Sequence, residues 1–403
     1  MNGQVLADIR VIDLTHYVAG PYCTKLFADF GADVIKVERP GTGDPARRLG
    51  PFPGDVPHPE KSGLFLFLNT NKRGITLNLK SETGRKILLE LVKGADILVE
   101  NFSPRVMPGL GLSYDELRKV NPRLVMTSIS NFGQDGPYRD LKASDLVLYA
   151  MGGAMSSTGL PDREPIRMPG NVIQYQAGTV AAAATMGAFL VARYQGVGQH
   201  VDVSIFETQL GSSDRRTTYL LGYQYHGLPA VREPPTGVPV GGIYPCADGY
   251  VAFLSVPAML PRFLDMVGRP DLITDPRFAS PAALLSPETK EFIHELLLPW
   301  LMARTRYEVM AEAQRARFPG MVVLSPGELV HDPHFEARGF WVEISHPVAG
   351  TFKYPGPPFR MSEGGWQVRR PAPLLGEHNE EIYCRELGYS RADLGKLQER
   401  GVI

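Results

Sequence analysis

Basic, amide and aromatic side chains follow short apolar runs in the first part of the chain. His16 and Tyr17 follow RVIDL, Arg39 follows DVIKVE, and Asn101 and Phe102 end ADILVENF. If these runs are parallel strands, their carboxyl ends meet at one edge of a sheet, where ligands bind. Such side chains would suit a ligand that carries an adenine ring and phosphates. They are also common in ordinary turns, so spacing alone leaves both interpretations open.

Other kinds of chemistry have less support in the sequence. His331 and His334 have the spacing of metal ligands, but no third ligand lies nearby, and we expect no metal. Ser157 and Ser204 lack the G-x-S-x-G context of a serine hydrolase. Neither G-x-G-x-x-G nor a P-loop motif is present. Three carboxylates could act as acids or bases, or could lie in surface turns: Asp145, Asp162 and Glu164.

The elements that would position these residues alternate between strand and helix patterns. Apolar runs predict strands at 10–14, 33–38, 74–79, 95–102 and 124–130, and periodic segments predict helices at 20–30, 81–93 and 113–120. Such alternation indicates βαβ units and a mainly parallel sheet. The sequence therefore predicts an α/β fold.

The pattern changes further along the chain. A helix of small residues at 177–192 precedes the strand HVDVSIF, and a loop rich in Pro and Gly follows at 234–242. We expect a large domain at 1–224, a smaller α+β domain at 225–330, and a segment at 331–403 that completes the large domain. A last helix is predicted at 377–387.

Composition and charge limit the classes of function. The 403 residues are 43% apolar and 21% charged, which is typical of a globular protein. The net charge of −1 gives no reason to expect a nucleic-acid partner. The three cysteines lie far apart and indicate no disulfide framework. The start lacks the features of a signal peptide, and the run at 177–192 is short for a membrane span. We therefore expect a cytoplasmic protein with no membrane partner.

Several ordered motifs are similar to those of the class III CoA-transferase family, the CaiB/BaiF type. They include VIDLTHYVAGPYCTKLFADFGADVIKVERPGTGD, LNTNKRGITLNLKS, ADILVENFSP, GGAMSSTGLPD, AGTVAAAATMGAFLVARYQGVGQHVDVSIFE and PAPLLGEHNEEI. The resemblance spans nearly the whole chain. It implies a Rossmann-like large domain built from both chain ends, a smaller domain between them, and an interlocked dimer.

The resemblance also implies contacts to coenzyme A, the acyl-carrying substrate. By matching motif these would be made by His16, Tyr17, Val18, Ala19, Arg39, Leu77, Lys80, Asn101, Phe102 and Lys142. Guanidinium and ammonium groups among them would pair with phosphates. Leu77 and Phe102 could hold the flat adenine. The family often has Arg or Lys eight residues after the Asn of ENF, where this chain has Gly109, although Arg105 lies nearby.

The resemblance breaks at the family's nucleophile. Family members use an Asp carboxylate, four residues before a Gly, to attack the acyl-CoA thioester. Here that Gly is Gly178, and Gln174 stands four residues before it. A carboxamide is neutral and forms no anhydride or thioester, so the aspartyl mechanism is closed to this residue. Gln174 is equally unable to transfer protons as the Asp of the racemase branch does.

Two hypotheses from different classes follow. In the first, the chain is the non-catalytic subunit of a heteromeric CoA-transferase, and a homologous partner supplies the Asp. It then resembles the Asp-lacking subunit of heteromeric members such as succinyl-CoA:benzylsuccinate CoA-transferase. In the second, a homodimer binds acyl-CoA or uses Asp145, Asp162 or Glu164 for a different reaction. A Gly-rich loop at Gly241 and Gly242 would cover the site in the first hypothesis.

Overall fold

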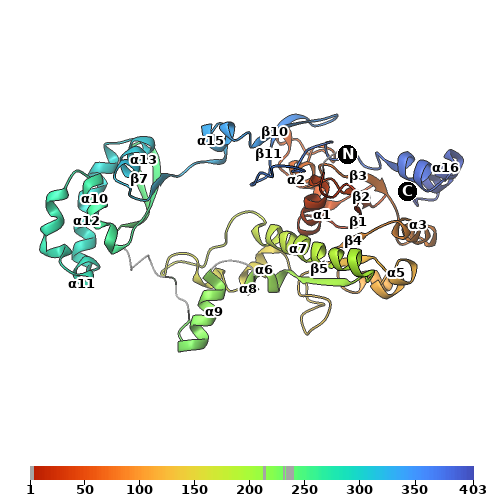
Figure 1. The fold of residues 1–403 in the computed structure, drawn as a ribbon, viewed down its shortest axis with the longest axis horizontal. Helices are drawn as coiled ribbons and strands as arrows, with labels where there is room; N and C mark the ends of the chain where they lie inside the picture. The colour runs from red at the N-terminus through yellow and green to blue at the C-terminus, as the bar shows by residue number, and fades with distance from the viewer. Residues whose placement is uncertain (1–3, 212–214, 230–231, 233–239) are drawn as a thin grey trace. The chain divides into compact units, whose positions relative to one another are not determined.

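The chain divides into two compact units. The computed structural model describes residues 4–211, 215–229, 232 and 240–403. The larger unit comprises residues 1–159, 165–230 and 338–403, and the smaller comprises 160–164 and 231–337. Both chain ends therefore belong to the larger unit, which carries the red and the dark blue segments of Figure 1. The smaller unit ends at 337, rather than at the expected 330.

A six-stranded parallel sheet forms the centre of the larger unit. Its strands are β1 (Arg10–Asp13), β2 (Asp33–Glu38), β3 (Arg73–Thr76), β4 (Ile97–Glu100), β5 (Val125–Ser130) and β6 (His200–Ser204). They lie in the order β3-β2-β1-β4-β5-β6, and all pairs are parallel. This is the order of the dinucleotide-binding fold, which reverses direction between β1 and β4. The predicted α/β class and strands are confirmed.

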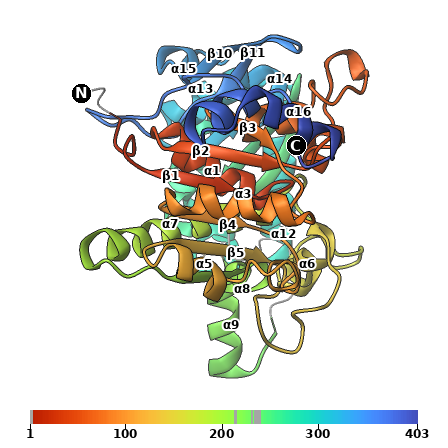
Figure 2. The same ribbon diagram turned by 90° about the vertical axis from the view of Figure 1, so that its right-hand side faces the viewer.

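Helices cover both faces of the sheet because successive strand residues point to opposite sides. Val11 belongs to the core beneath one set of helices and Ile12 to the core beneath the other. The first set is α1 (Ala19–Asp29), α6 (Asp145–Met151), α7 (Val172–Gln195) and α8 (Ile205–Gly211). The second is α3 (Glu82–Lys93), α5 (Tyr114–Val120), a π-helix (Glu380–Glu386) and α16 (Arg391–Glu399). Figure 2 shows α3 and α16 in this second layer.

The remaining elements of the larger unit lie around the sheet. They are α2 (Gly63–Leu68), α4 (Val106–Gly109), α9 (Arg215–His226), β10 (Trp341–His346) and β11 (Gly350–Pro355), with 3₁₀ turns at Pro45–Arg48, Pro53–Asp55 and Met155–Ser157. Strands β10 and β11 form an antiparallel hairpin. Side chains of this hairpin and of α2 share a separate small core that contains Phe65 and Tyr354.

The helix predicted at 377–387 is present as a π-helix at Glu380–Glu386, and a regular helix, α16, follows it. The buried Tyr383 donates a hydrogen bond from its hydroxyl to the carbonyl of Thr76 at 2.6 Å, which ties this segment to the end of β3. This tertiary contact has no counterpart in the local sequence pattern.

The smaller unit is built on a three-stranded antiparallel sheet. Its strands are β7 (Gly241–Cys246), β8 (Gly249–Leu254) and β9 (Gly320–Val322), in that order. Its helices are α10 (Leu260–Met266), α11 (Pro281–Leu284), α12 (Pro287–Met302), α13 (Arg306–Arg315), α14 (Pro326–Leu329) and α15 (Pro333–Ala337), with 3₁₀ turns at Pro257–Met259, Pro270–Thr274 and Pro276–Phe278. The α+β character agrees with the sequence pattern.

The predicted loop at Gly241 and Gly242 is wrong. Both glycines lie in β7, where they pair with Leu254 and Phe253 of β8. Ladder pairing with β8 overrides the usual tendency of Gly-Gly to form a turn. Residues 234–239 of the predicted loop lie outside the described residues.

Helix α7 approaches the start of α1 very closely. A Cβ at Gly178 would lie 2.5 Å from the carbonyl oxygen of Ala19, so only glycine fits there without displacement.

Helix α7 is long and apolar enough to cross a membrane, by length and composition alone. Among the described helices it is the one that passes this test, and in the fold it packs against α1 and β5.

Substitution of Gly178 by Ala should therefore be destabilising, by about 1–3 kcal/mol of unfolding free energy, because the helices must move apart. Gly187→Ala on the same helix is a matched control, since its Cβ would meet nothing within 4 Å. It should leave stability unchanged or raise it by up to about 1 kcal/mol through helix propensity. Urea unfolding followed by circular dichroism measures both. Equal effects of the two substitutions would contradict this account.

Candidate functional site

The carboxyl ends of β1 and β4 form the crevice expected of this strand order. Asn101, directly after β4, accepts a hydrogen bond from the backbone N–H of His16 and donates one to its carbonyl, each at 2.8 Å. The rings of His16 and Phe102 meet edge to face, with centroids 5.2 Å apart. The side chain of Asn101 thus links the ends of β1 and β4 through these two hydrogen bonds.

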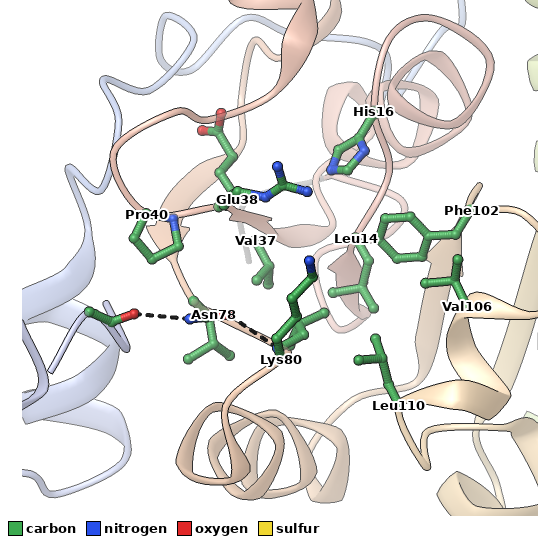
Figure 3. Close-up of a pocket in the computed structure, with 14 residues that line it drawn as sticks. Leu14, His16, Val37, Glu38, Pro40, Asn78, Lys80, Phe102, Val106 and Leu110 are labelled. Atoms are coloured by element: carbon green, nitrogen blue, oxygen red, sulfur yellow. Dashed lines mark hydrogen bonds between the residues drawn. The ribbon is translucent and has the colours of Figure 1, made fainter.

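A cavity of about 700 Å³ opens at this edge. Five of the predicted coenzyme A contacts line it: His16, Arg39, Leu77, Lys80 and Phe102. They come from the ends of β1, β2, β3 and β4, so the fold gathers residues that lie far apart in sequence. In Figure 3 the Lys80 side chain extends into the space opposite His16 and Phe102. Leu14, Val37, Val106 and Leu110 add apolar walls.

The cavity combines apolar walls with available positive charge. Arg39 and Lys80 are exposed, and neither forms an ion pair with another described residue. Glu38 also lines the cavity, but its carboxylate is held by Arg47 at 2.7 Å. Burial, followed by the charge of Lys36, lowers the pKa of His16, so its imidazole is neutral at pH 7. Such a cavity can hold a flat ring and phosphate groups.

A second cavity of about 270 Å³ lies next to the first, and Phe102 lines both. Gln174 lines this smaller cavity from the first turn of α7. Asn101 and Lys142, both predicted from sequence, line it as well. The structure therefore places Gln174 in one cavity with three of the predicted coenzyme A contacts, Asn101, Phe102 and Lys142.

Three predicted contacts do not line either cavity as the described residues define them: Tyr17, Val18 and Ala19. The side chains of Val18 and Ala19 are buried in the core. Tyr17 has a positive φ of 64° and donates its backbone N–H to Asp44 at 3.1 Å. These residues form the turn into α1. Val18 and Ala19 can therefore offer a ligand only backbone N–H groups, whereas the N–H of Tyr17 is already bonded to Asp44 and its side chain is half exposed.

A buried ion pair, which sequence reasoning missed, fixes this turn. Lys36 of β2 lies 2.9 Å from Asp44, and both side chains are fully buried. Lys36 also donates to the carbonyl of Thr15 at 2.7 Å. Burial is the largest influence on both groups and opposes their charges, but nearby charges and hydrogen bonds together outweigh it. The charges of Asp44, Asp13 and Glu38 raise the pKa of Lys36, and the charge of Lys36 with the hydrogen bond from Ala46 lowers that of Asp44. A lone Lys within the apolar run DVIKVE was the only available signal.

The candidate carboxylates of the second hypothesis lie outside the Gln174 cavity. Asp145 begins α6 and lies 3.8 Å from Arg167, while Asp162 and Glu164 are exposed and belong to the smaller unit. The carboxylate that does line the cavity, Asp140, is held by Arg105 in a two-point hydrogen-bonded pair, at 2.8 and 2.5 Å. Arg105 lies near Gly109 in the sequence, where the family often has a basic residue. Its charge is already paired with Asp140.

No group of three His, Cys, Asp or Glu side chains is arranged to hold a metal ion among the described residues. His331 and His334, which have suitable spacing, therefore lack a third ligand in that part of the chain.

The fold and the two cavities define a Rossmann-like α/β protein with a crevice suited to an adenine-and-phosphate ligand. The profile of CoA-transferase family III matches residues 6–379. A formyl-CoA:oxalate CoA-transferase of Streptomyces avermitilis is 37% identical, over 99% of this chain and 100% of its own length. A succinyl-CoA–D-citramalate CoA-transferase of Chloroflexus aurantiacus is 35% identical, over 99% and 98% respectively.

Solved structures agree with the sequence comparison. A CaiB/BaiF family protein from Brucella suis has a TM-score of 0.85 at 27% identity, covering 95% of this chain and 99% of its own. Rv3272 from Mycobacterium tuberculosis has a TM-score of 0.79 at 28% identity, covering 94% and 99%. The chain belongs to CoA-transferase family III, and the resemblance seen in its motifs is confirmed.

Glu100, the last residue of β4, is hydrogen-bonded to the backbone of Phe102. It is buried, and its carboxylate accepts the backbone N–H of Phe102 at 2.8 Å. Burial raises its pKa to about 7, against hydrogen bonds from Ser128 and Phe102 that lower it, and the charge of Asp202 adds to the rise. The folded protein thus holds this proton more tightly than the unfolded chain does. The stability that results is fully present below pH 4.5 and is lost as pH rises through about 7.

Glu100→Gln removes this titration and should be relatively more stable at high pH. Between pH 5 and pH 8 the variant should gain about 2 kcal/mol of unfolding free energy relative to the natural chain. Urea unfolding at several pH values measures the difference. A difference that is constant with pH would show that Glu100 does not change protonation in this range.

Proposed function

We propose that this chain is the non-catalytic subunit of a heteromeric class III CoA-transferase. The observation that carries the proposal is the position of Gln174, whose carboxamide lines a cavity that adjoins the predicted coenzyme A cavity. On this proposal the chain keeps the pocket of its family and has Gln174 where the family's nucleophile would stand. An Asp-bearing homologue is the partner, in an interlocked heterodimer or a larger heteromer.

The two cavities suggest how an acyl-CoA would lie. The adenine would rest against Leu77 and Phe102, and Arg39 and Lys80 would pair with its phosphates. Phe102 lines both cavities, so the pantetheine arm would pass it and bring the thioester toward Gln174. Lys142 would add positive charge beside that path.

The chemistry would take place on the partner subunit. Its Asp carboxylate attacks the thioester carbonyl, the C–S bond breaks, and a mixed anhydride and CoA thiolate result. The thiolate then attacks the aspartyl carbonyl, which forms an aspartyl-CoA thioester and releases the first acid. The acceptor carboxylate then attacks the aspartyl-CoA carbonyl, the C–S bond breaks, and a second mixed anhydride and CoA thiolate result. The thiolate attacks the acceptor's carbonyl in this anhydride, which yields the new acyl-CoA and releases the Asp carboxylate.

The relatives indicate the kind of substrates. The names of the two relatives describe transfer of CoA between an acyl-CoA and a dicarboxylic acid, oxalate or citramalate. For this chain we propose succinyl-CoA as a donor and a carboxylic acid such as benzylsuccinate as the acceptor. The alternative, a homodimer that uses its own carboxylate, has less support because Asp145, Asp162 and Glu164 lie outside the Gln174 cavity.

Coenzyme A binding tests the first half of the proposal. Arg39→Gln and Lys80→Gln should each weaken CoA binding roughly tenfold, because a charge-assisted contact to phosphate is lost. Isothermal titration calorimetry with the purified chain measures the affinity. Lys86→Gln is the control, since Lys86 lies on α3 and pairs with Glu82, outside the cavity. If the control weakens binding as much as the other two, the ligand does not occupy this cavity.

Restoring the carboxylate tests the second half. Gln174→Asp should form a covalent adduct with succinyl-CoA that hydroxylamine removes, whereas the natural chain should form none. Intact-mass spectrometry detects it. Gln176→Asp is the matched control, because Gln176 donates its side-chain amide to Thr208 at 2.8 Å and lies outside the cavity. A folded Gln174→Asp chain that binds CoA and forms no adduct would show that this position is not equivalent to the family's nucleophile.

A further inference from the structure

The larger unit has a third cavity, of about 250 Å³, whose lining differs from that of the two cavities already described. Residues of α4, α5, β4, β5 and β6 contribute to its walls. Glu100, which accepts the backbone N–H of Phe102, is one of them. Because Phe102 lines both of the other cavities, Glu100 connects this third cavity to the predicted coenzyme A site.

Three polar side chains of this cavity form a hydrogen-bonded series, which we call the Glu100 relay: Glu100, Ser128 and His200. Ser128 is hydrogen-bonded to the carboxyl group of Glu100, and its Oγ lies 2.9 Å from Nε2 of His200. Glu100 and Ser128 are only 3% and 1% exposed, whereas His200 is exposed. The relay therefore leads from solvent to a buried carboxyl group that is bonded to the backbone of Phe102.

The Glu100 relay can satisfy its hydrogen bonds with Glu100 either charged or neutral, because a hydroxyl group both donates and accepts. With Glu100 ionised, Ser128 donates to the carboxylate and accepts the Nε2–H of His200. With Glu100 protonated, its O–H donates to Ser128, and Ser128 donates to Nε2.

One proton converts the first arrangement into the second. Solvent adds it to Nδ1 of His200, the Nε2 proton moves to Ser128, and the original hydroxyl proton of Ser128 moves to Glu100. His200 ends neutral, as the other tautomer.

The surroundings of Glu100 keep the two arrangements close in free energy near neutral pH. Burial raises the pKa of Glu100 to about 7, and hydrogen bonds from Ser128 and Phe102 oppose the rise. The charge of Asp202, on β6, adds to it.

The exposed end of the relay is held by α5. The ring of His200 stacks on Tyr114, with centroids 5.5 Å apart. Partial desolvation lowers the pKa of His200, against the charges of Asp202 and Asp115, so the imidazole is neutral at pH 7. Arg118 contacts the Tyr114 ring but does not line the cavity. The cavity as the described residues define it has no Lys or Arg in its lining, and α4 adds only uncharged side chains, Met107 and Pro108.

We propose that the Glu100 relay takes up a proton as pH falls through neutrality and thereby strengthens the binding of an anionic ligand in the neighbouring coenzyme A cavity. Arg39 and Lys80 offer that cavity positive charge, and an ionised Glu100 adds negative charge at the Phe102 backbone that borders it. Charges interact strongly over such distances in a protein interior. The inference rests on the proposed coenzyme A site and adds regulation by pH to it.

CoA binding at several pH values between 5.5 and 8.5, measured by isothermal titration calorimetry on the full chain, tests the inference. The affinity of the natural chain relative to Glu100→Gln should fall about fivefold over this range, because only the natural chain gains a charge. The phosphates of CoA titrate in both measurements, so the ratio isolates Glu100. Glu363→Gln removes an exposed carboxylate outside the three cavities and is the matched control, whose ratio should not change with pH.

Variants at the other two positions test the relay itself. Ser128→Ala removes a hydrogen bond that favours the ionised carboxylate, so the midpoint of the affinity change should rise by about one pH unit. Ser128→Thr keeps the hydroxyl and should restore the natural midpoint. His200→Phe keeps a ring on Tyr114 but removes the acceptor that Ser128 needs when Glu100 is neutral, so the midpoint should fall. Carbon-13 NMR of the Glu carboxyl groups, with the Glu100 signal assigned by its loss in Glu100→Gln, reads the same midpoints without ligand.

The outcomes separate this inference from the proposed function. A ratio of affinities that is constant with pH would overturn the inference and leave the coenzyme A site standing. Midpoints that shift in the same direction in Ser128→Ala and His200→Phe would also overturn it, because general damage to the structure would explain them. A natural chain that binds no CoA at any pH would overturn the proposed function. In that case a Glu100 carboxyl signal that does not titrate between pH 5.5 and 8.5 would overturn the relay independently.

Discussion

The buried ion pair between Lys36 and Asp44 fixes the loop that borders the larger cavity at the edge of the sheet. The Nζ of Lys36 lies 2.9 Å from the Oδ2 of Asp44, and neither side chain is exposed to solvent. Lys36 also holds the carbonyl of Thr15, and Asp44 holds the N–H of Tyr17. An uncompensated buried charge costs several kcal/mol, so the end of β1 cannot move independently of β2. His16 and the start of α1 are thereby placed at the point where the strand order reverses.

Much of the fold could be predicted because strand and helix periods are local. The strands at β1 to β6 follow from short apolar runs, and the shared edge follows from parallel pairing. Features set by distant contacts could not be predicted. The π-helix depends on Tyr383 reaching Thr76, and the strand at Gly241 depends on pairing with β8. At the site, five predicted contacts share one cavity, but no local signal reveals that Val18 and Ala19 are buried.

Gln174 and the cavity that it lines are central to the proposed function. Gly178 still allows α7 to approach α1 closely, so Gln174 is presented where the cavities adjoin. Asp140, the carboxylate of that cavity, is neutralised by Arg105. A cavity whose lining carboxylate is already paired is consistent with the proposal that a partner performs the covalent step.

The central claim is that the chain works with a different, Asp-bearing homologue. Native mass spectrometry of the complex, purified from its own source through a tag on this chain, tests it most directly. The account predicts a mass that combines the 44.3 kDa chain with a second, similar but distinct subunit. A single species at twice 44.3 kDa would contradict this proposal, because both subunits would then have Gln174 and neither would have an Asp at that position.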